Sequence, residues 1–186
     1  MIIGVTGFFC AGKDSFAEIL MEKGLRHISL SDMIRDEIRR LGKEVNLENL
    51  TLTGNALRAE FGPGVLAQRA LEKIGQDDCY VVTSIRHSKE VETLQQRPDF
   101  TMIFVDAPIK LRYERSLQRN RKGDYESFEG FAAAEKAQLE SDDPNSQQLL
   151  ACKNMAGLVV ENAGSREELV QKAQDIIERL QSDSAK

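Results

Sequence analysis

The chain has 186 residues and a mass of 20.9 kDa, which suits one domain and is too short for two ordinary ones. It carries 25 Lys and Arg against 30 Asp and Glu, a net charge of −5, so it offers no general cationic surplus for nucleic-acid phosphates. With 41% hydrophobic and 30% charged residues, the composition excludes a disordered chain.

The cysteines and the apolar runs restrict the cellular setting. Cys10, Cys79 and Cys152 are odd in number and form no Cys-x-x-Cys or Cys-x-x-His pattern, which argues against a disulfide framework or a zinc site. No apolar run approaches the length needed to cross a bilayer, and no basic leader follows Met1. We therefore expect a cytoplasmic protein with no membrane partner.

Short apolar runs alternate with longer amphipathic stretches, which is typical of an α/β protein with a parallel sheet. Continuous apolar, β-branched runs suit strands that are buried on both faces. The five predicted strands are Ile2–Thr6, His27–Leu30, Tyr80–Thr83, Thr101–Asp106 and Leu158–Glu161, and all of them except His27–Leu30 are runs of this kind.

Helices are predicted where apolar residues recur every three or four positions. The first lies around Phe16–Leu20, and a second follows with Ser31 as its expected N-cap. The clearest covers Leu169–Leu180, behind a capping box formed by Ser165 and Glu168.

Two segments are expected to leave the sheet as excursions rather than pack against it. Residues 43–74 contain two helix candidates punctuated by glycines and a proline, and residues 119–144 are polar. No repeat or linker divides the chain, so we expect a single domain over residues 1–181. Residues 182–186 are expected to be a flexible tail or the cut edge of a longer protein.

The first predicted strand runs directly into GFFCAGKDS, residues 7–15, and then into a helix. This is G-x-x-x-x-G-K in the strand–loop–helix setting of a phosphate-binding loop. Gly7 and Gly12 are expected to allow positive φ, and the N–H groups around Lys13 to point at a phosphate. The alternative, a glycine turn with an exposed lysine, does not explain the whole pattern. The expected ATP-binding residues are Gly7, Ala11, Gly12, Lys13, Asp14 and Ser15.

Asp14 occupies the position where this motif usually has the Ser or Thr that binds Mg²⁺. A carboxylate suits a hard cation, and the Ser15 hydroxyl stands beside it. No acid follows the third predicted strand at Thr83, where a metal-orienting carboxylate is expected. Either Asp14 supplies the carboxylate that is missing after the third strand, or metal-assisted chemistry has been lost. Phosphoryl transfer needs a metal ion to hold the phosphates, which favours the first alternative.

Four further segments resemble those of P-loop nucleoside monophosphate kinases and dephospho-CoA kinases. Ser29–Arg35 is similar to their acceptor-site segment, and Val81–Arg86 to their third-strand segment. Phe104–Pro108, with the arginines that follow, is similar to their fourth strand and arginine-bearing lid. Asn162–Leu169 is similar to the adenine-side loop of dephospho-CoA kinases. Almost end to end, the chain resembles dephospho-CoA-kinase-like, adenylate-kinase-related proteins best known from archaea.

This resemblance implies a three-layer α/β P-loop kinase fold with a five-stranded, mainly parallel sheet in the order 2-3-1-4-5. Residues 43–74 are then an acceptor-side helical insertion, residues 119–144 a lid region, and Asn162 and Gly164 part of the ATP site. The implied activity is ATP- and Mg²⁺-dependent phosphoryl transfer in nucleotide metabolism. The implied partner is a small nucleotide acceptor, and the implied assembly is a monomer or homodimer.

Arg112, Arg115 and Arg119 are spaced to share one helix face. Such a stripe is often a solvated surface, but a transferring phosphoryl group needs cations around its oxygens. With a phosphate-binding loop upstream, we expect Arg115 and Arg119 to be catalytic and Arg112 to be structural.

Arg35 and Arg86 follow the second and third strands, which places them at the carboxyl edge where ligands bind. They are expected to hold the acceptor, together with Asp32. Arg58 is a further acceptor-phosphate candidate, with a plain helix surface as the alternative.

The nature of the acceptor decides the role of Asp32. A nucleoside or deoxynucleoside monophosphate is already anionic, so Asp32 would only orient it. A sugar hydroxyl, as in dephospho-CoA, needs a base, with Asp32 the first candidate and Asp14 the second. The candidate arginines favour a phosphorylated acceptor. Two other hypotheses are a non-catalytic nucleotide-sensing module linked to a nucleotide-metabolism enzyme, and a hydrolase, for which no water-positioning glutamine motif is found.

Overall fold

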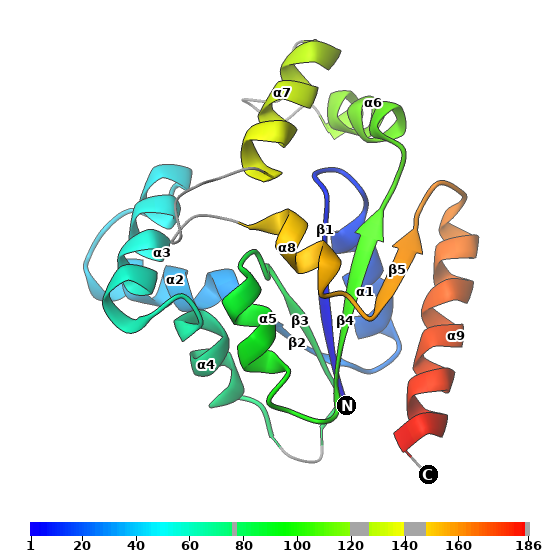
Figure 1. Ribbon diagram of the computed structural model, residues 1–186, viewed down its shortest axis with the longest axis horizontal. Coiled ribbons are helices and arrows are strands. Elements are labelled where there is room, and N and C mark those ends of the chain that lie inside the picture. The colour runs from blue at the N-terminus through cyan, green and yellow to red at the C-terminus, as the bar shows by residue number, and fades with distance from the viewer. Residues whose placement is uncertain (76–77, 120–126, 140–147, 185–186) are drawn as a thin grey trace.

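The computed structural model describes residues 1–75, 78–119, 127–139 and 148–184. Its sheet is parallel throughout and has the order β2-β3-β1-β4-β5, which confirms the predicted order (Figure 1). The strands are β1 (Ile2–Gly7), β2 (Arg26–Ser29), β3 (Tyr80–Thr83), β4 (Phe100–Asp106) and β5 (Leu158–Glu161). All five predicted strands are present, with β2 one residue earlier than expected.

Helices cover both faces of the sheet and give three layers (Figure 1). Successive strand residues point to opposite faces, so continuous apolar strands supply two cores. Ile3 and Val5 pack in one core with α1 (Lys13–Glu22) and α9 (Arg166–Ser184). Ile2 packs in the other core with α2 (Leu30–Arg40), α3 (Leu47–Phe61), α4 (Val65–Leu71), α5 (Ser88–Leu94) and α8 (Leu149–Asn154).

The segment 43–74 packs into the second core, which corrects its prediction as an excursion away from the sheet. Leu57 of α3 and Leu66 and Ala70 of α4 are buried in the same cluster as Val82 of β3. Gly54 allows close packing, since a Cβ there would lie 3.0 Å from Ile34, whereas Gly62, with φ 91°, ends α3.

Two helix boundaries differ from the sequence prediction. Helix α2 begins at Leu30 with Ser29 as its N-cap residue, so Ser31 lies inside the first turn. Helix α9 continues to Ser184, which replaces most of the expected tail; residues 185–186 lie outside the described residues. At its start, the Ser165 hydroxyl accepts a hydrogen bond from Glu168 N at 3.3 Å, which is one of the two bonds of the predicted capping box.

Helices α6 (Ile109–Arg119) and α7 (Phe128–Leu139) lie beyond the carboxyl edge of the sheet (Figure 1). Arg112 joins them, because its buried guanidinium pairs with Glu135 of α7 and donates to the Ala107 carbonyl at 2.8 Å. Arg112 is therefore structural, as predicted. The remainder of the predicted lid region, residues 120–126 and 140–144, lies outside the described residues.

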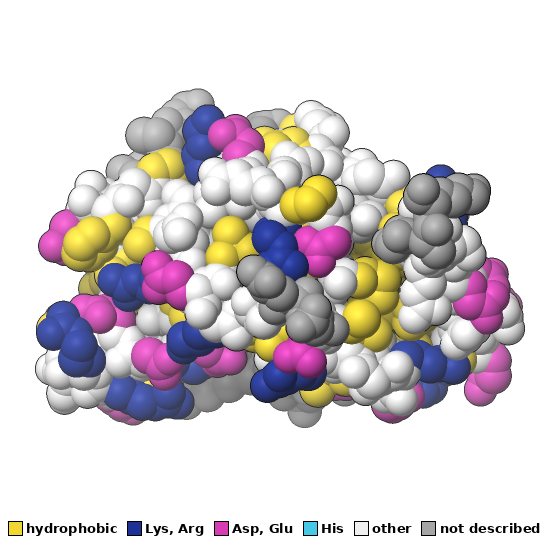
Figure 2. All heavy atoms as spheres, turned by 90° about the horizontal axis from the view of Figure 1, so that it is seen from below, with side chains coloured by type: hydrophobic (Ala, Val, Ile, Leu, Met, Phe, Trp, Pro, Cys, Tyr) yellow, Lys and Arg dark blue, Asp and Glu magenta, His cyan; other side chains and the backbone are white. Residues whose placement is uncertain are grey.

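Within the described ranges, no helix combines the length and apolar character needed to span a bilayer. Figure 2 shows one face of the molecule, on which basic and acidic side chains are interspersed instead of forming a patch of one sign. This distribution agrees with the acidic net charge and does not provide a cationic surface on that face.

Candidate functional site

The loop between β1 and α1 contains two residues in the left-handed region, Cys10 with φ 57° and Gly12 with φ 90°. In such a loop, successive backbone N–H groups can converge on an anion. Helix α1 begins directly afterwards, and its first turn is closed by a hydrogen bond of 2.9 Å from Phe16 N to the Gly12 carbonyl. The partial positive charge of a helix N-terminus is added to the loop.

Gly7 is required for a reason different from the predicted one. It ends β1 and is not among the positive-φ glycines of the described residues. A Cβ at Gly7 would lie 2.2 Å from the carbonyl oxygen of Val105, its partner in β4. Glycine therefore allows the two strands to approach where the loop leaves the sheet.

Lys13 places a largely buried ammonium group at this loop. Burial lowers its pKa, the Asp14 carboxylate opposes that effect, and the neighbouring Arg86 and Arg119 add to it. Asp14 Oδ1 is 4.0 Å from Lys13 Nζ, which is longer than a hydrogen bond. A buried cation near other cations is stabilised by an incoming anion.

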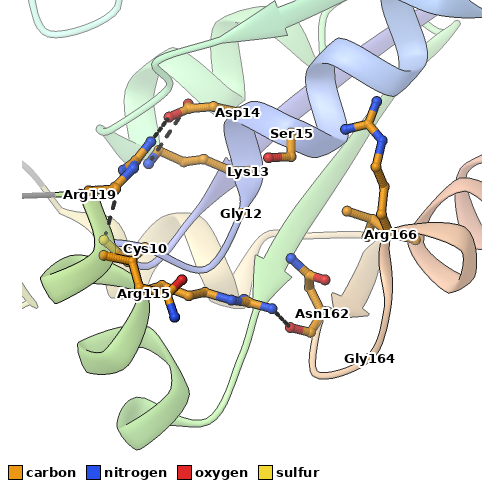
Figure 3. A pocket seen from close by; sticks show the side chains of 12 residues that line it. Cys10, Gly12, Lys13, Asp14, Ser15, Arg115, Arg119, Asn162, Gly164 and Arg166 are labelled. Atoms are coloured by element: carbon orange, nitrogen blue, oxygen red, sulfur yellow. Dashed lines mark hydrogen bonds and ion pairs between the residues drawn. The ribbon is translucent and has the colours of Figure 1, made fainter.

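The loop opens into a cavity of about 400 Å³ (Figure 3). Helix α1, helix α6 and the loop between β5 and α9 form its walls. The cavity brings together eight predicted site residues: Gly12, Lys13, Asp14, Ser15, Arg115, Arg119, Asn162 and Gly164. Gln118, Arg166 and Leu169 also line it and were not predicted as ligands. Gln118 could have been predicted from the sequence, because it follows Arg115 by three residues and therefore shares its helix face.

Arg115 and Arg119 reach from α6 toward the phosphate-binding loop (Figure 3). Arg119 Nη2 is 3.3 Å from Asp14 Oδ2, and its Nη1 is 3.8 Å from Cys10 Sγ. Burial acts to lower the pKa of Arg119, but the Cys10 thiol and the Asp14 carboxylate together raise it. The guanidinium groups of Arg115 and Arg119 thus lie close to the loop that carries Lys13.

Asn162 ties the loop to the opposite wall of the cavity. Its buried side-chain amide donates to the Ala11 carbonyl at 2.9 Å, and its backbone carbonyl accepts from Arg115 Nη2 at 3.0 Å. A Cβ on Gly12 would lie 2.2 Å from Asn162 Nδ2. Ala11, Gly12 and Asn162 therefore form one packed unit.

Two of the predicted acceptor residues, Asp32 and Arg35, contact each other at the start of α2. Arg35 Nη1 donates to Asp32 Oδ1 at 2.7 Å and to Ser31 Oγ at 2.8 Å. The hydroxyl groups of Ser29, Ser31 and Ser84 lie 2.8 to 3.3 Å apart. Ser84 has φ 63°, a strained conformation for a residue with a side chain.

Arg58 is buried, whereas Arg86 is partly exposed. Arg58 is 6% exposed and pairs with Glu90 at 2.9 Å, so the alternative of an exposed helix surface is wrong. Burial lowers the pKa of Arg86, whereas Glu90 and Asp14 act in the opposite direction. Arg86 thus interacts electrostatically with Glu90 of α5 and with Asp14 of the phosphate-binding loop.

Asp14 and Ser15 are the residues suited to hold Mg²⁺. The Asp14 side chain is 57% exposed, and both residues line the cavity. No cluster of three or more His, Cys, Asp or Glu side chains forms a metal site in the part of the chain that the structure describes. Because Mg²⁺ usually takes one or two carboxylates plus substrate phosphates, these residues fit a cation that arrives with a nucleotide.

Cys152 of α8 is predicted to be chemically inert in the folded protein. Burial, reinforced by Glu90, raises the pKa of its thiol to about 12, so very little thiolate exists at pH 8. Iodoacetamide at this pH should modify the half-buried Cys79 and spare Cys152, as measured by peptide mass spectrometry. Protein unfolded in urea serves as the control, and modification of Cys152 as fast as Cys79 in folded protein would contradict the prediction.

No protein-family model matches the chain. The UPF0200 protein of Sulfurisphaera tokodaii is 32% identical over 179 residues, covering 96% of this chain and 97% of that protein. The UPF0200/UPF0201 protein of Archaeoglobus fulgidus is 31% identical over 185 residues. This second alignment covers 96% of the chain and only 55% of that longer relative.

The solved structures that are similar to this chain include kinases. TT1252 from Thermus thermophilus has a TM-score of 0.59 at 22% identity, covering 97% of each chain. Shikimate kinase from Aquifex aeolicus has a TM-score of 0.57 at 15% identity, covering 100% of this chain and 99% of that one. A gluconokinase from Sinorhizobium meliloti has a TM-score of 0.54 at 17% identity, with coverages of 98% and 94%.

At these identities the structural likeness shows the fold alone, which is the α/β fold of P-loop kinases. The sequence match to the Sulfurisphaera protein is stronger evidence of kinship, because it spans nearly all of both chains. The chain belongs to the UPF0200 family.

Proposed function

We propose that the protein transfers the γ-phosphoryl group of ATP to a small nucleotide acceptor, most directly a nucleoside or deoxynucleoside monophosphate. The observation that carries this proposal is the Lys13 ammonium at the N-terminus of α1, which lines the same cavity as Arg115 and Arg119 and is 17% exposed. Phosphoryl transfer requires little covalent chemistry from the protein, and depends on cations fixed around the phosphates.

On the donor side, Lys13 and the N–H groups after Gly12 hold the β- and γ-phosphates. Arg119 exchanges the Asp14 carboxylate, 3.3 Å away, for an oxygen of the transferring group. Asn162 and Gly164 form the wall on the adenine side. When bound, Mg²⁺ neutralises charge on the phosphates, and Asp14 and Ser15 are its protein ligands.

On the acceptor side, the first candidate is an anionic phosphate. Arg86 supports an anionic acceptor, because its guanidinium interacts electrostatically with Lys13 and Asp14 of the phosphate-binding loop, here called the donor loop. Arg35 lies at the same edge of the sheet, and its guanidinium forms an ion pair with the Asp32 carboxylate at 2.7 Å. An anionic acceptor oxygen needs no base, so Asp32 has an orienting role.

A sugar hydroxyl, as in dephospho-CoA, is the second candidate. It is favoured by the three serine hydroxyls that gather next to Arg35, and by the pairing of Arg35 and Arg58 with carboxylates. In that case the hydroxyl proton passes to the Asp32 carboxylate as the hydroxyl oxygen attacks the γ-phosphorus. The bond from the γ-phosphorus to the bridging oxygen breaks, and ADP leaves.

A coupled assay of ADP release tests both candidates. The panel contains the ribo- and deoxyribonucleoside monophosphates and dephospho-CoA, each with ATP and Mg²⁺. Turnover with a monophosphate supports the first candidate, and turnover with dephospho-CoA alone supports the second. If calorimetry detects ATP binding but no acceptor is phosphorylated, the nucleotide-sensing interpretation replaces the proposal.

Asp14→Asn is expected to lower kcat about 100-fold and to raise the Mg²⁺ concentration needed for half-maximal rate. An amide lacks the charge that a carboxylate offers to the cation. The measurement is a Mg²⁺ titration of the rate at saturating ATP. Glu18→Gln, an exposed change farther along α1, is the matched control. An unchanged Mg²⁺ titration for Asp14→Asn would remove Asp14 from the proposed metal site.

A further inference from the structure

Glu90 of α5 is a carboxylate with no solvent exposure, and both of its oxygens are engaged. Oε1 accepts hydrogen bonds from Arg58 Nη2 at 2.9 Å and Nε at 3.3 Å. Oε2 accepts from the backbone N–H groups of Arg86 at 2.9 Å and His87 at 3.1 Å. One oxygen therefore holds α3, and the other holds the loop between β3 and α5.

The same loop is fixed at other points. Thr6 of β1 donates to the Ile85 carbonyl at 2.6 Å, and Gln148 N donates to the Arg86 carbonyl at 2.7 Å. Ser88 also bonds to the Gln148 side chain at 2.8 Å. The Arg86 backbone is therefore hydrogen-bonded at both of its polar groups, through its N–H to Glu90 and through its carbonyl to Gln148.

A buried ion pair of this kind is poorly explained by stability alone. The cost of removing two charges from water is comparable with their attraction, and an apolar pair of similar size is often as stable or more so. What the Arg58–Glu90 pair adds is a fixed geometry, because the planar guanidinium meets the carboxylate through two of its nitrogen atoms.

The charges around the Arg86 guanidinium come from two parts of the site. Glu90 and Arg58 act on it from α5 and α3, and Asp14 acts on it from the start of α1. Arg86 in turn acts on Lys13. The guanidinium of Arg86 is therefore within electrostatic range of the start of α1 as well as of α3 and α5, while its backbone is held by Glu90 and Gln148.

We propose that the buried Arg58–Glu90 pair positions Arg86 at the junction of donor and acceptor sites. Arg58 and Glu90 are then positioning residues that act through Arg86, and Arg58 does not itself bind the acceptor phosphate. This inference rests on the proposed phosphoryl transfer and identifies the residues that set the affinity for the acceptor.

The test compares the wild type with the double variant Arg58→Met, Glu90→Met, which replaces the ion pair by an apolar one. The acceptor is the compound of the panel, nucleoside monophosphate or dephospho-CoA, that the wild type phosphorylates fastest. We expect the acceptor KM to rise about tenfold while the KM for ATP stays within about twofold. Thermal unfolding identifies the folded variants.

Two single variants complete the design. Glu92→Gln on the same helix is the matched control, because Glu92 is exposed and pairs with Lys89 at the surface; its KM values should equal those of the wild type. Arg58→Lys keeps both charges but loses the fork of the guanidinium, and should raise the acceptor KM to an intermediate value. It also tests the proposal if the double variant does not fold.

The outcomes separate this inference from the proposed function. A wild-type protein that phosphorylates no acceptor overturns the proposed function and this inference with it. If the wild type is active but the folded variants keep its acceptor KM, this inference alone is overturned. A parallel rise of both KM values overturns it too, since that result indicates a general structural effect.

Discussion

Lys13→Ala is expected to lower kcat/KM for phosphoryl transfer about a thousandfold. The substitution removes the cation that faces the β- and γ-phosphates, in a place where burial makes each charge more effective than in water. The stability of the fold should not fall, because the ion pair of Lys13 with Asp14 is a long contact of 4.0 Å. Steady-state rates and thermal unfolding measure the two effects separately.

Lys23→Ala is the matched control for this variant. Lys23 is the exposed C-cap residue of the same helix, α1, and lies at the end opposite the phosphate-binding loop. Its removal changes the net charge equally and should leave the rate within about twofold of the wild type. If Lys13→Ala kept a tenth or more of the wild-type kcat/KM, the proposed role of the loop would be wrong.

Gly12→Ala is expected to weaken ATP binding about 100-fold and to destabilise the fold by roughly 1–3 kcal/mol. Gly12 has φ 90°, where a side chain is strained. Its Cβ would also lie 2.2 Å from Asn162 Nδ2 and would displace the amide that bonds to the Ala11 carbonyl. Calorimetric titration with ATP and denaturant unfolding give the two quantities.

Gly24→Ala is a control that separates the effect of backbone strain from the effect of the steric clash with Asn162. Gly24 has φ 97°, close to that of Gly12, but a Cβ there would meet nothing within 4 Å. This control should lose stability through backbone strain and keep the wild-type affinity for ATP. Equal ATP affinities for Gly12→Ala and Gly24→Ala would show that the packing of Asn162 on the loop does not matter for nucleotide binding.

Local signals explain what the sequence predicted well. Four of the predicted strands are short apolar runs, as expected of parallel strands with buried faces, whereas β2 lies at an edge of the sheet and begins with two exposed polar residues. The phosphate-binding loop is a contiguous motif, so Lys13 and the left-handed Gly12 follow from spacing alone. The strand order came from the resemblance to P-loop kinases.

Features that depend on distant packing could not be read in the same way. Arg58 looks like a surface residue of an amphipathic helix, and only the fold shows Glu90, 32 residues later, buried against it. Gly7 resembles a turn glycine, but the approach of Val105 in β4 is what excludes a side chain. The segment 43–74 has the glycines of an excursion, although Leu57 and Leu66 complete a core.

The proposed transfer is tested most directly by following ATP labelled in its γ-phosphate, incubated with the protein, Mg²⁺ and the nucleotide panel. We predict that the label appears in one acceptor in amounts equal to the ADP formed, and that Lys13→Ala abolishes its appearance. Label released only as inorganic phosphate would identify a hydrolase. Label that stays in bound ATP would identify a nucleotide-sensing module, and either result would contradict the proposed phosphotransferase.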